Sequence, residues 1–132
     1  MLGKSRRDQG EIRTLLGQGT RIVGDLIFEG GLHLDGRVEG NVLALAGTQA
    51  VVTIGASGTV RGSVEAPEVI VEGTVEGDVF ASERVELGPS ARVVGNVVYR
   101  LIEMASGAEV NGKLVHRTAG SLDGDHPVSQ RI

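Results

Sequence analysis

Apolar and polar residues alternate over short stretches of this chain, and one stretch of five residues recurs six times. In each copy, aliphatic residues at the first and fifth positions flank a central glycine, as in Val38 to Val42 (VEGNV). A β-strand turns residues i, i+2 and i+4 to the same face, so both aliphatic side chains point inward. Glycine between them permits a corner or a close approach of two backbones. The copies occupy residues 22–26, 38–42, 60–64, 75–79, 93–97 and 110–114.

This repeat predicts a stack of coils. Its central glycines lie 16, 22, 15, 18 and 17 residues apart, and a unit of this length is too short to fold alone. We expect structural corners at Gly24, Gly40, Gly62, Gly77, Gly95 and Gly112. Turn-forming side chains follow five of the six glycines and predict a ladder along one edge. The six following residues are Asp25, Asn41, Ser63, Asp78, Asn96 and Lys113.

Further strand candidates lie between the copies, and most of them alternate with period two and end at a glycine. They cover residues 32–34, 52–54, 69–71, 85–87 and 101–104. Three short strands per coil of about 17 residues predict an all-β fold, a triangular parallel β-helix of about six coils. With coils about 4.8 Å apart, the rod is roughly 25–30 Å long. The longest interval contains residues 43–49, which we expect to form a loop at one corner.

The pattern divides the chain into one domain and two tails. We expect a flexible tail over residues 1–19, the β-helix over 20–114, and a polar, disordered tail over 115–132. A short apolar cluster in the first tail predicts a brief strand or turn that caps the first coil. It consists of Ile12, Leu15 and Leu16.

Composition narrows the functional classes. The 132 residues contain no cysteine, which removes disulfides, thiolate metal sites and cysteine nucleophiles. Aromatic residues make up only 2% of the chain, which suits a narrow interior built from Val, Ile, Leu and Ala. No signal-peptide pattern or run of about 20 apolar residues is visible, so we expect a cytoplasmic location.

Charge is unevenly distributed. Residues 1–19 carry a net charge of +2, whereas residues 20–114 carry seven basic and thirteen acidic side chains. An acidic body with few aromatic residues predicts no binding of nucleic acid. The first residues combine apolar and cationic side chains, which favours contact with anionic membrane lipids. We expect this segment to bind membrane through Met1, Leu2, Lys4, Arg6 and Arg7. An ordinary soluble start region is the alternative.

No constellation of residues predicts an enzyme, a cofactor or a metal site. We expect His33 in the second coil, His116 at the end of the last coil and His126 in the tail, whereas a zinc site needs converging ligands. Residues 123–125 (DGD) lack the remaining spacing of a calcium loop. The inward positions do not follow the strict hexads of left-handed hexapeptide enzymes. No glycine–lysine loop for a nucleotide phosphate is visible either.

The two ends of the stack are the first candidates for a functional surface. An unpaired end coil exposes backbone groups and aliphatic side chains, and natural proteins usually block such edges. We expect a polymerisation interface made of residues near both ends, although tails folded over the ends would instead leave a monomer. The predicted interface residues are Leu26, Phe28, Leu32, Leu34, Leu101, Ile102, Met104, Val110 and Leu114.

A lateral binding surface is the alternative, as in an adaptor that does not polymerise. The candidates are residues 43–53, an acidic ridge, and the pair Tyr99 and Arg100, whose strand face the sequence does not determine. The proposed ridge consists of Glu65, Glu68, Glu72 and Glu76.

With these motifs in view, the chain resembles the bactofilins, bacterial polymer-forming cytoskeletal proteins. The resemblance covers roughly residues 15–115 and is most specific in four segments, whose order and spacing together carry it. These are residues 19–26, 34–42, 81–87 and 93–100.

The resemblance implies a right-handed β-helix with disordered tails. It also implies end-to-end assembly into non-polar filaments without nucleotide, and attachment of the N-terminus to the inner face of the cytoplasmic membrane. The implied role is a scaffold for cell-shape or cell-wall machinery. Its partners would then be further copies of this chain, inner-membrane lipids, and cell-wall enzymes or other client proteins.

Overall fold

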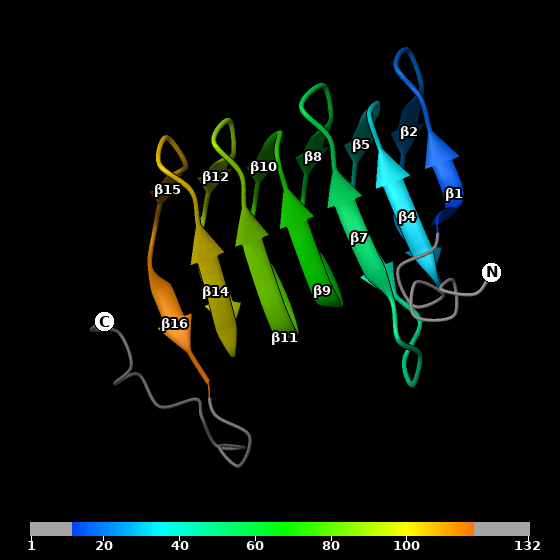
Figure 1. Cartoon of the computed structure of the whole chain (residues 1–132). Coiled ribbons are helices and arrows are strands. Elements are labelled where there is room, and N and C mark those ends of the chain that lie inside the picture. The colour runs from blue at the N-terminus through cyan, green and yellow to red at the C-terminus, as the bar shows by residue number, and fades with distance from the viewer. Residues whose placement is uncertain (1–11, 118–132) are drawn as a thin grey trace, which may run out of the picture.

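Three short strands separated by tight turns repeat six times over residues 12–117, the part of the chain that the computed structural model describes. Each strand pairs in parallel with the equivalent strand of the next coil. The coils wind right-handed into a stack that runs from the first coil (blue) to the last (orange) in Figure 1. The predicted all-β, triangular β-helix is confirmed. Residues 12–117 contain no helix long and apolar enough to cross a membrane.

The solenoid has three faces, which we number in the order in which the chain enters them after the first strand. Face 1 consists of β2 (Arg21–Val23), β5 (Arg37–Glu39), β8 (Thr59–Arg61), β10 (Thr74–Glu76), β12 (Arg92–Val94) and β15 (Glu109–Asn111). Face 2 consists of β3 (Leu26–Phe28), β6 (Val42–Ala44), the first parts of β9 (Val64–Val71) and β11 (Val79–Leu87), β13 (Val97–Tyr99) and β16 (Leu114–His116). Face 3 consists of β1 (Ile12–Leu16), β4 (Gly31–Leu34), β7 (Val51–Ile54), the later parts of β9 and β11, and β14 (Leu101–Met104).

The core is a set of aliphatic columns that run along the stack. On face 1, Val38, Val60, Val75 and Val93 occupy successive positions in register, and each is fully buried. Columns of the same kind line the other two faces. In the described residues, no polar or charged side chain belongs to the buried set. The interior therefore consists of interchangeable layers, each of which buries its side chains against the coil on either side.

The repeated glycines form a column at the corner between faces 1 and 2. A Cβ atom on Gly40 would overlap the carbonyl oxygen of Gly24, and the same overlap with the preceding glycine recurs at each later corner. The later corners are Gly62, Gly77, Gly95 and Gly112. Only glycine lets successive backbones approach this closely.

A second column, of polar side chains, stands beside the glycines. Asp25 Oδ1 accepts a hydrogen bond from the backbone N–H of Asn41 at 3.1 Å, and Asn41 Oδ1 accepts one from Ser63 at 2.9 Å. Asp78 and Asn96 accept equivalent bonds from the next coil, both at 2.9 Å. Each side chain thus bonds the backbone of the following coil, and these bonds tie neighbouring coils together.

The first strand lies at the apolar cluster for which the sequence predicts a brief strand or turn that caps the first coil. β1 starts at Ile12, inside the segment expected as a tail, and pairs with β4. The last strand, β16, ends at His116, close to the expected boundary at residue 114. The expected loop after β6 leaves the stack before β7 begins (Figure 1).

Candidate assembly surfaces at the two ends of the solenoid

The N-terminal end of the stack is an open layer. Within residues 12–117, strands β1, β2 and β3 each pair on one side only, so one edge of each has no strand beside it. Each strand contributes one inward aliphatic side chain that packs on the core but is only partly buried: Leu16, Ile22 and Leu26. These three residues, the N-end triangle, leave apolar surface and backbone hydrogen-bonding groups facing along the axis.

The C-terminal end is an open layer of the same construction. Strands β14, β15 and β16 pair only with the preceding coil among the described residues. Ile102, Val110 and Leu114 are their partly buried inward residues, one from each face, and we call them the C-end triangle. Met104 widens this surface and is 44% exposed. Both ends therefore display the side chains that a further coil would bury.

The structure places the predicted interface residues in three different situations. Leu26, Ile102, Val110 and Leu114 lie in the end triangles, and Met104 lies beside the second one. Leu101 is 61% exposed, because it points outward from face 3. Phe28 belongs to the first coil but is buried.

Leu32 and Leu34 lie one coil inside the end. Both are fully buried, because β1 pairs with β4 and covers them. Ile22 and Leu16 take the places at the end instead. Ile22 is the first residue of the first copy of the repeat, so the sequence pattern already indicates that it faces inward at this end. Leu16 belongs to the apolar cluster that predicts a cap on the first coil, and its pairing with Leu34 places it at this end.

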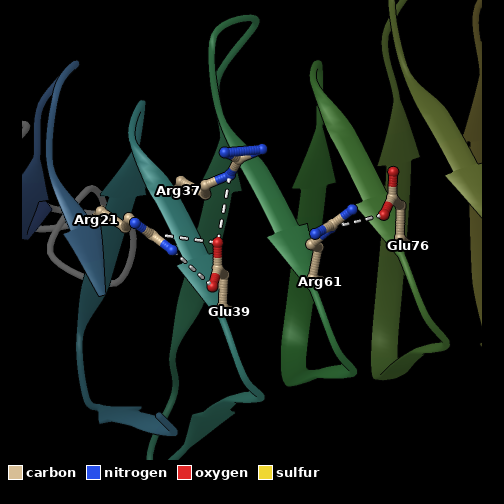
Figure 2. A network of polar contacts seen from close by, with 5 residues as sticks. All are labelled: Arg21, Arg37, Glu39, Arg61 and Glu76. Atoms are coloured by element: carbon tan, nitrogen blue, oxygen red, sulfur yellow. Dashed lines mark hydrogen bonds and ion pairs between the residues drawn. The ribbon is translucent and has the colours of Figure 1, made fainter. Parts of the chain in front are cut away.

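Charged side chains on face 1 connect the first coil to the second. Figure 2 shows Arg21 and Arg37 converging on Glu39, at 3.3 Å and 3.8 Å. The hydrogen bond from Arg21, together with the charges of Arg37 and Arg61, lowers the pKa of the Glu39 carboxyl. A similar pair joins Arg61 to Glu76 at 3.0 Å. Exposed pairs of this kind contribute at most about 1 kcal/mol each to stability. We therefore infer that they help to set the register between coils rather than to stabilise the fold.

The structure separates the other candidate groups. His33 lies on face 3 of the second coil and pairs with Asp35 at 3.0 Å, whereas His116 lies on face 2 of the last coil and its ring stands 5.4 Å from that of Tyr99. Tyr99 is buried, so it does not form an exposed pair with Arg100. No group of three potential metal ligands is found within residues 12–117.

The proposed acidic ridge does not exist as a single surface. Glu65 points outward on face 2, Glu68 lies on face 3, and Glu76 lies on face 1. Glu72 sits at the turn between faces 3 and 1. The predicted membrane-binding residues and His126 lie outside the described residues. Those membrane-binding residues are Met1, Leu2, Lys4, Arg6 and Arg7.

The family model and the curated relatives that match this chain indicate the same protein family. A family model described as "Bactofilin: Polymer-forming cytoskeletal" matches residues 14–115. The chain is 29% identical to Bactofilin BacO of Myxococcus xanthus (strain DK1622) over 109 residues, which cover 83% of each chain. It is 35% identical to Bactofilin BacP of the same strain over 101 residues, which cover 76% of this chain and 40% of BacP. No solved structure matches it significantly. The matched region coincides with the stack of coils and includes both end triangles, and the chain therefore belongs to the bactofilin family of polymer-forming cytoskeletal proteins.

Proposed function

We propose that this protein assembles end to end, without nucleotide, into non-polar filaments that act as a scaffold for cell-shape or cell-wall machinery. One observation carries the proposal: both end layers present a triangle of inward aliphatic side chains that matches the layers inside the stack. A second copy placed on an end would continue the burial and the backbone pairing with no new chemistry. No catalytic role enters the proposal.

A non-polar filament joins N-end to N-end and C-end to C-end, an arrangement that we take from the family resemblance. A polar, head-to-tail filament has a specific observation in its favour. Continuing the ladders of face 1 and of the polar column would bring Arg21 next to Glu109, and Asp25 next to Lys113, of another copy. The two arrangements predict different particles when one end is blocked: dimers for the non-polar filament and monomers for the polar one.

We further propose that the basic N-terminal segment holds the filament on the inner face of the cytoplasmic membrane. One segment supplies a weak contact, since each basic residue near an anionic surface contributes about 1 kcal/mol. A filament carries many such segments, and their avidity makes attachment stable. Polymerisation and membrane binding would then be coupled.

Electron microscopy of the purified chain without nucleotide or metal tests assembly. We expect thin, unbranched filaments. Discrete particles at every salt and protein concentration would contradict the proposal and favour an adaptor that does not polymerise. Co-sedimentation with vesicles of anionic lipid tests the membrane contact. Replacing Lys4, Arg6 and Arg7 with Glu should abolish it while filaments still form.

A further inference from the structure

A groove runs along the outer surface of the solenoid, at the corner between faces 2 and 3. Its volume is about 600 Å³, and it extends from the loop after β6 to Arg117 after β16. The small residues Ala44, Ala66 and Ala81 are among those that line it. The groove crosses from the second coil to the sixth, about 19 Å at 4.8 Å per coil, which matches about six residues of extended chain.

The loop forms one wall of the groove in a fixed position. Its Leu45 N–H donates to the carbonyl oxygen of Phe28 at 2.7 Å, and the hydroxyl of Thr48 donates to the carbonyl oxygen of Leu45 at 2.7 Å. These bonds hold the Leu45 side chain 47% exposed at the edge of the groove. Phe80 and Val98 point outward and make the part of the groove next to Arg100 apolar, whereas Glu65, in register with Phe80, lines the part next to the loop. Phe80 is 37% exposed.

The far end of the groove carries two arginines that differ from the others. Seven arginine side chains lie in the part of the chain whose side chains are described, and five of them form ion pairs with glutamate. Arg100 and Arg117 form no ion pair with any described residue, and both line the groove. An apolar stretch next to two cations that pair with no described residue is complementary to an apolar segment that is followed by carboxylates.

We propose that this groove is a docking site for a short, extended segment of another protein, in which apolar side chains precede acidic ones. The apolar side chains pack on Phe80 and Val98, and the carboxylates bind Arg100 and Arg117. A membrane surface fits less well, because a broad anionic surface would meet the exposed Glu29, Glu65 and Glu83 of this corner together, whereas a short segment places its carboxylates only at the end that carries Arg100 and Arg117. The site goes beyond filament formation, since it lies on the side of the stack and serves a single copy as well as a filament.

The test uses the full chain and two labelled peptides, measured by fluorescence anisotropy. The acidic probe is acetyl-Ser-Leu-Val-Leu-Gly-Glu-Glu-amide, and the basic probe has Lys in place of both Glu residues. The test variant combines Arg100→Glu with Arg117→Glu. The matched control combines Arg61→Glu with Arg92→Glu, the same two charge changes on face 1, where Arg61 pairs with Glu76 at 3.0 Å and Arg92 with Glu109 at 3.5 Å.

We expect the native chain to prefer the acidic probe at least tenfold. The double variant should lose that preference and bind the basic probe instead, while the control binds within twofold of the native chain. Phe80→Ser should weaken both probes about equally. Equal binding of both probes, or an equal loss in the control, would overturn the proposal. The same samples are examined by electron microscopy, so filament formation is scored separately from peptide binding.

Other occupants of the groove give distinct results, each of which overturns the proposal. If Asp123→Asn with Asp125→Asn raises the affinity for the acidic probe severalfold, the chain's own residues 118–132 occupy the groove. If the double variant loses binding only to phosphatidylglycerol vesicles, the ligand is a lipid. If it changes only the lateral pairing of filaments, the occupant is a second copy.

Discussion

The interior coils and the end coils of this solenoid have the same construction and differ only in what covers them. On face 1, Val60 and Val75 are fully buried because each lies between two neighbours in register, whereas Ile22 and Val110 have one neighbour and remain partly exposed. The chemistry of the layer does not change between these positions. An end of the stack is therefore a core layer that lacks one neighbouring coil. In the proposed filament, another copy supplies that neighbour and buries the exposed side chains.

Changing a leucine to lysine inside the stack and at its end gives the largest expected contrast. Leu34 is fully buried under β1, so Leu34→Lys should cost about 3–5 kcal/mol in the free energy of unfolding and abolish the fold. The same change at Leu26 should cost about 1 kcal/mol, because that side chain is partly exposed. Circular dichroism with urea titration measures both. An equal loss at the two positions would mean that the N-end triangle is already covered.

A methyl group in the glycine column should be costly only where coils are stacked. Gly77→Ala places a Cβ atom against the carbonyl oxygen of Gly62 and should destabilise the fold by about 2–4 kcal/mol. Gly17→Ala is the control, since a Cβ atom there meets no atom within 4 Å. We expect a change within about 0.5 kcal/mol for the control in thermal unfolding. A stable Gly77→Ala variant would show that the coils are not stacked this closely.

The polar column should contribute less than the core. Asn41→Ala removes the acceptor for the Ser63 N–H and should cost about 1 kcal/mol. Asn111→Ala is the control, because its exposed side chain makes no hydrogen bond with another described residue. Urea titration distinguishes the two variants. Equal losses of stability would mean that the hydrogen bonds of the polar column do not tie the coils together.

The smallest expected effect is on the stability of the fold at acidic pH, through the Glu39 carboxyl. The folded-state pKa of Glu39 is lowered, so its contribution to stability is present above the ordinary pKa of 4.5 and is lost as the pH falls through the folded value. Stability should therefore fall more steeply below pH 4.5 in the native chain than in Glu39→Gln. Arg21→Gln removes the main cause and should give the same shallower profile. Parallel profiles for all three proteins would contradict the assignment.

The sequence predicts most of this fold because each coil repeats the same short sequence motif. An aliphatic pair around glycine specifies an inward strand and a corner at Gly40 as well as at Gly95, and stacking follows from the repeat length. The polar column was also predictable from Asp25 and Asn41. However, its side chains bond the next coil, which is a long-range relation that local turn propensity does not reveal.

The sequence predicts the end layer only in part, because it indicates a cap at residues 12–16 but not the strand pairing that this cap makes. The residues of β1 lack the glycine motif, and their pairing with β4 depends on a contact across a full coil that contains β2 and β3. For that reason Leu32 and Leu34 were expected at the end, although β1 buries them. The sequence names part of the groove wall, since residues 43–53 and Arg100 are among its candidates for a lateral surface, but it does not predict the groove. It depends on where the loop carrying Leu45 folds back and on which arginines find glutamate partners in register.

The most direct test of the central claim blocks the ends one at a time and measures the mass of the particles by size-exclusion chromatography with multi-angle light scattering. Leu26→Glu blocks the N-end, Leu114→Glu blocks the C-end, and both should retain the circular dichroism spectrum of the native chain. A non-polar filament predicts dimers from each single variant, joined through the end that is still open, and monomers from the double variant. Monomers from both single variants would indicate a polar filament. Native-length filaments from the double variant would contradict end-to-end assembly altogether.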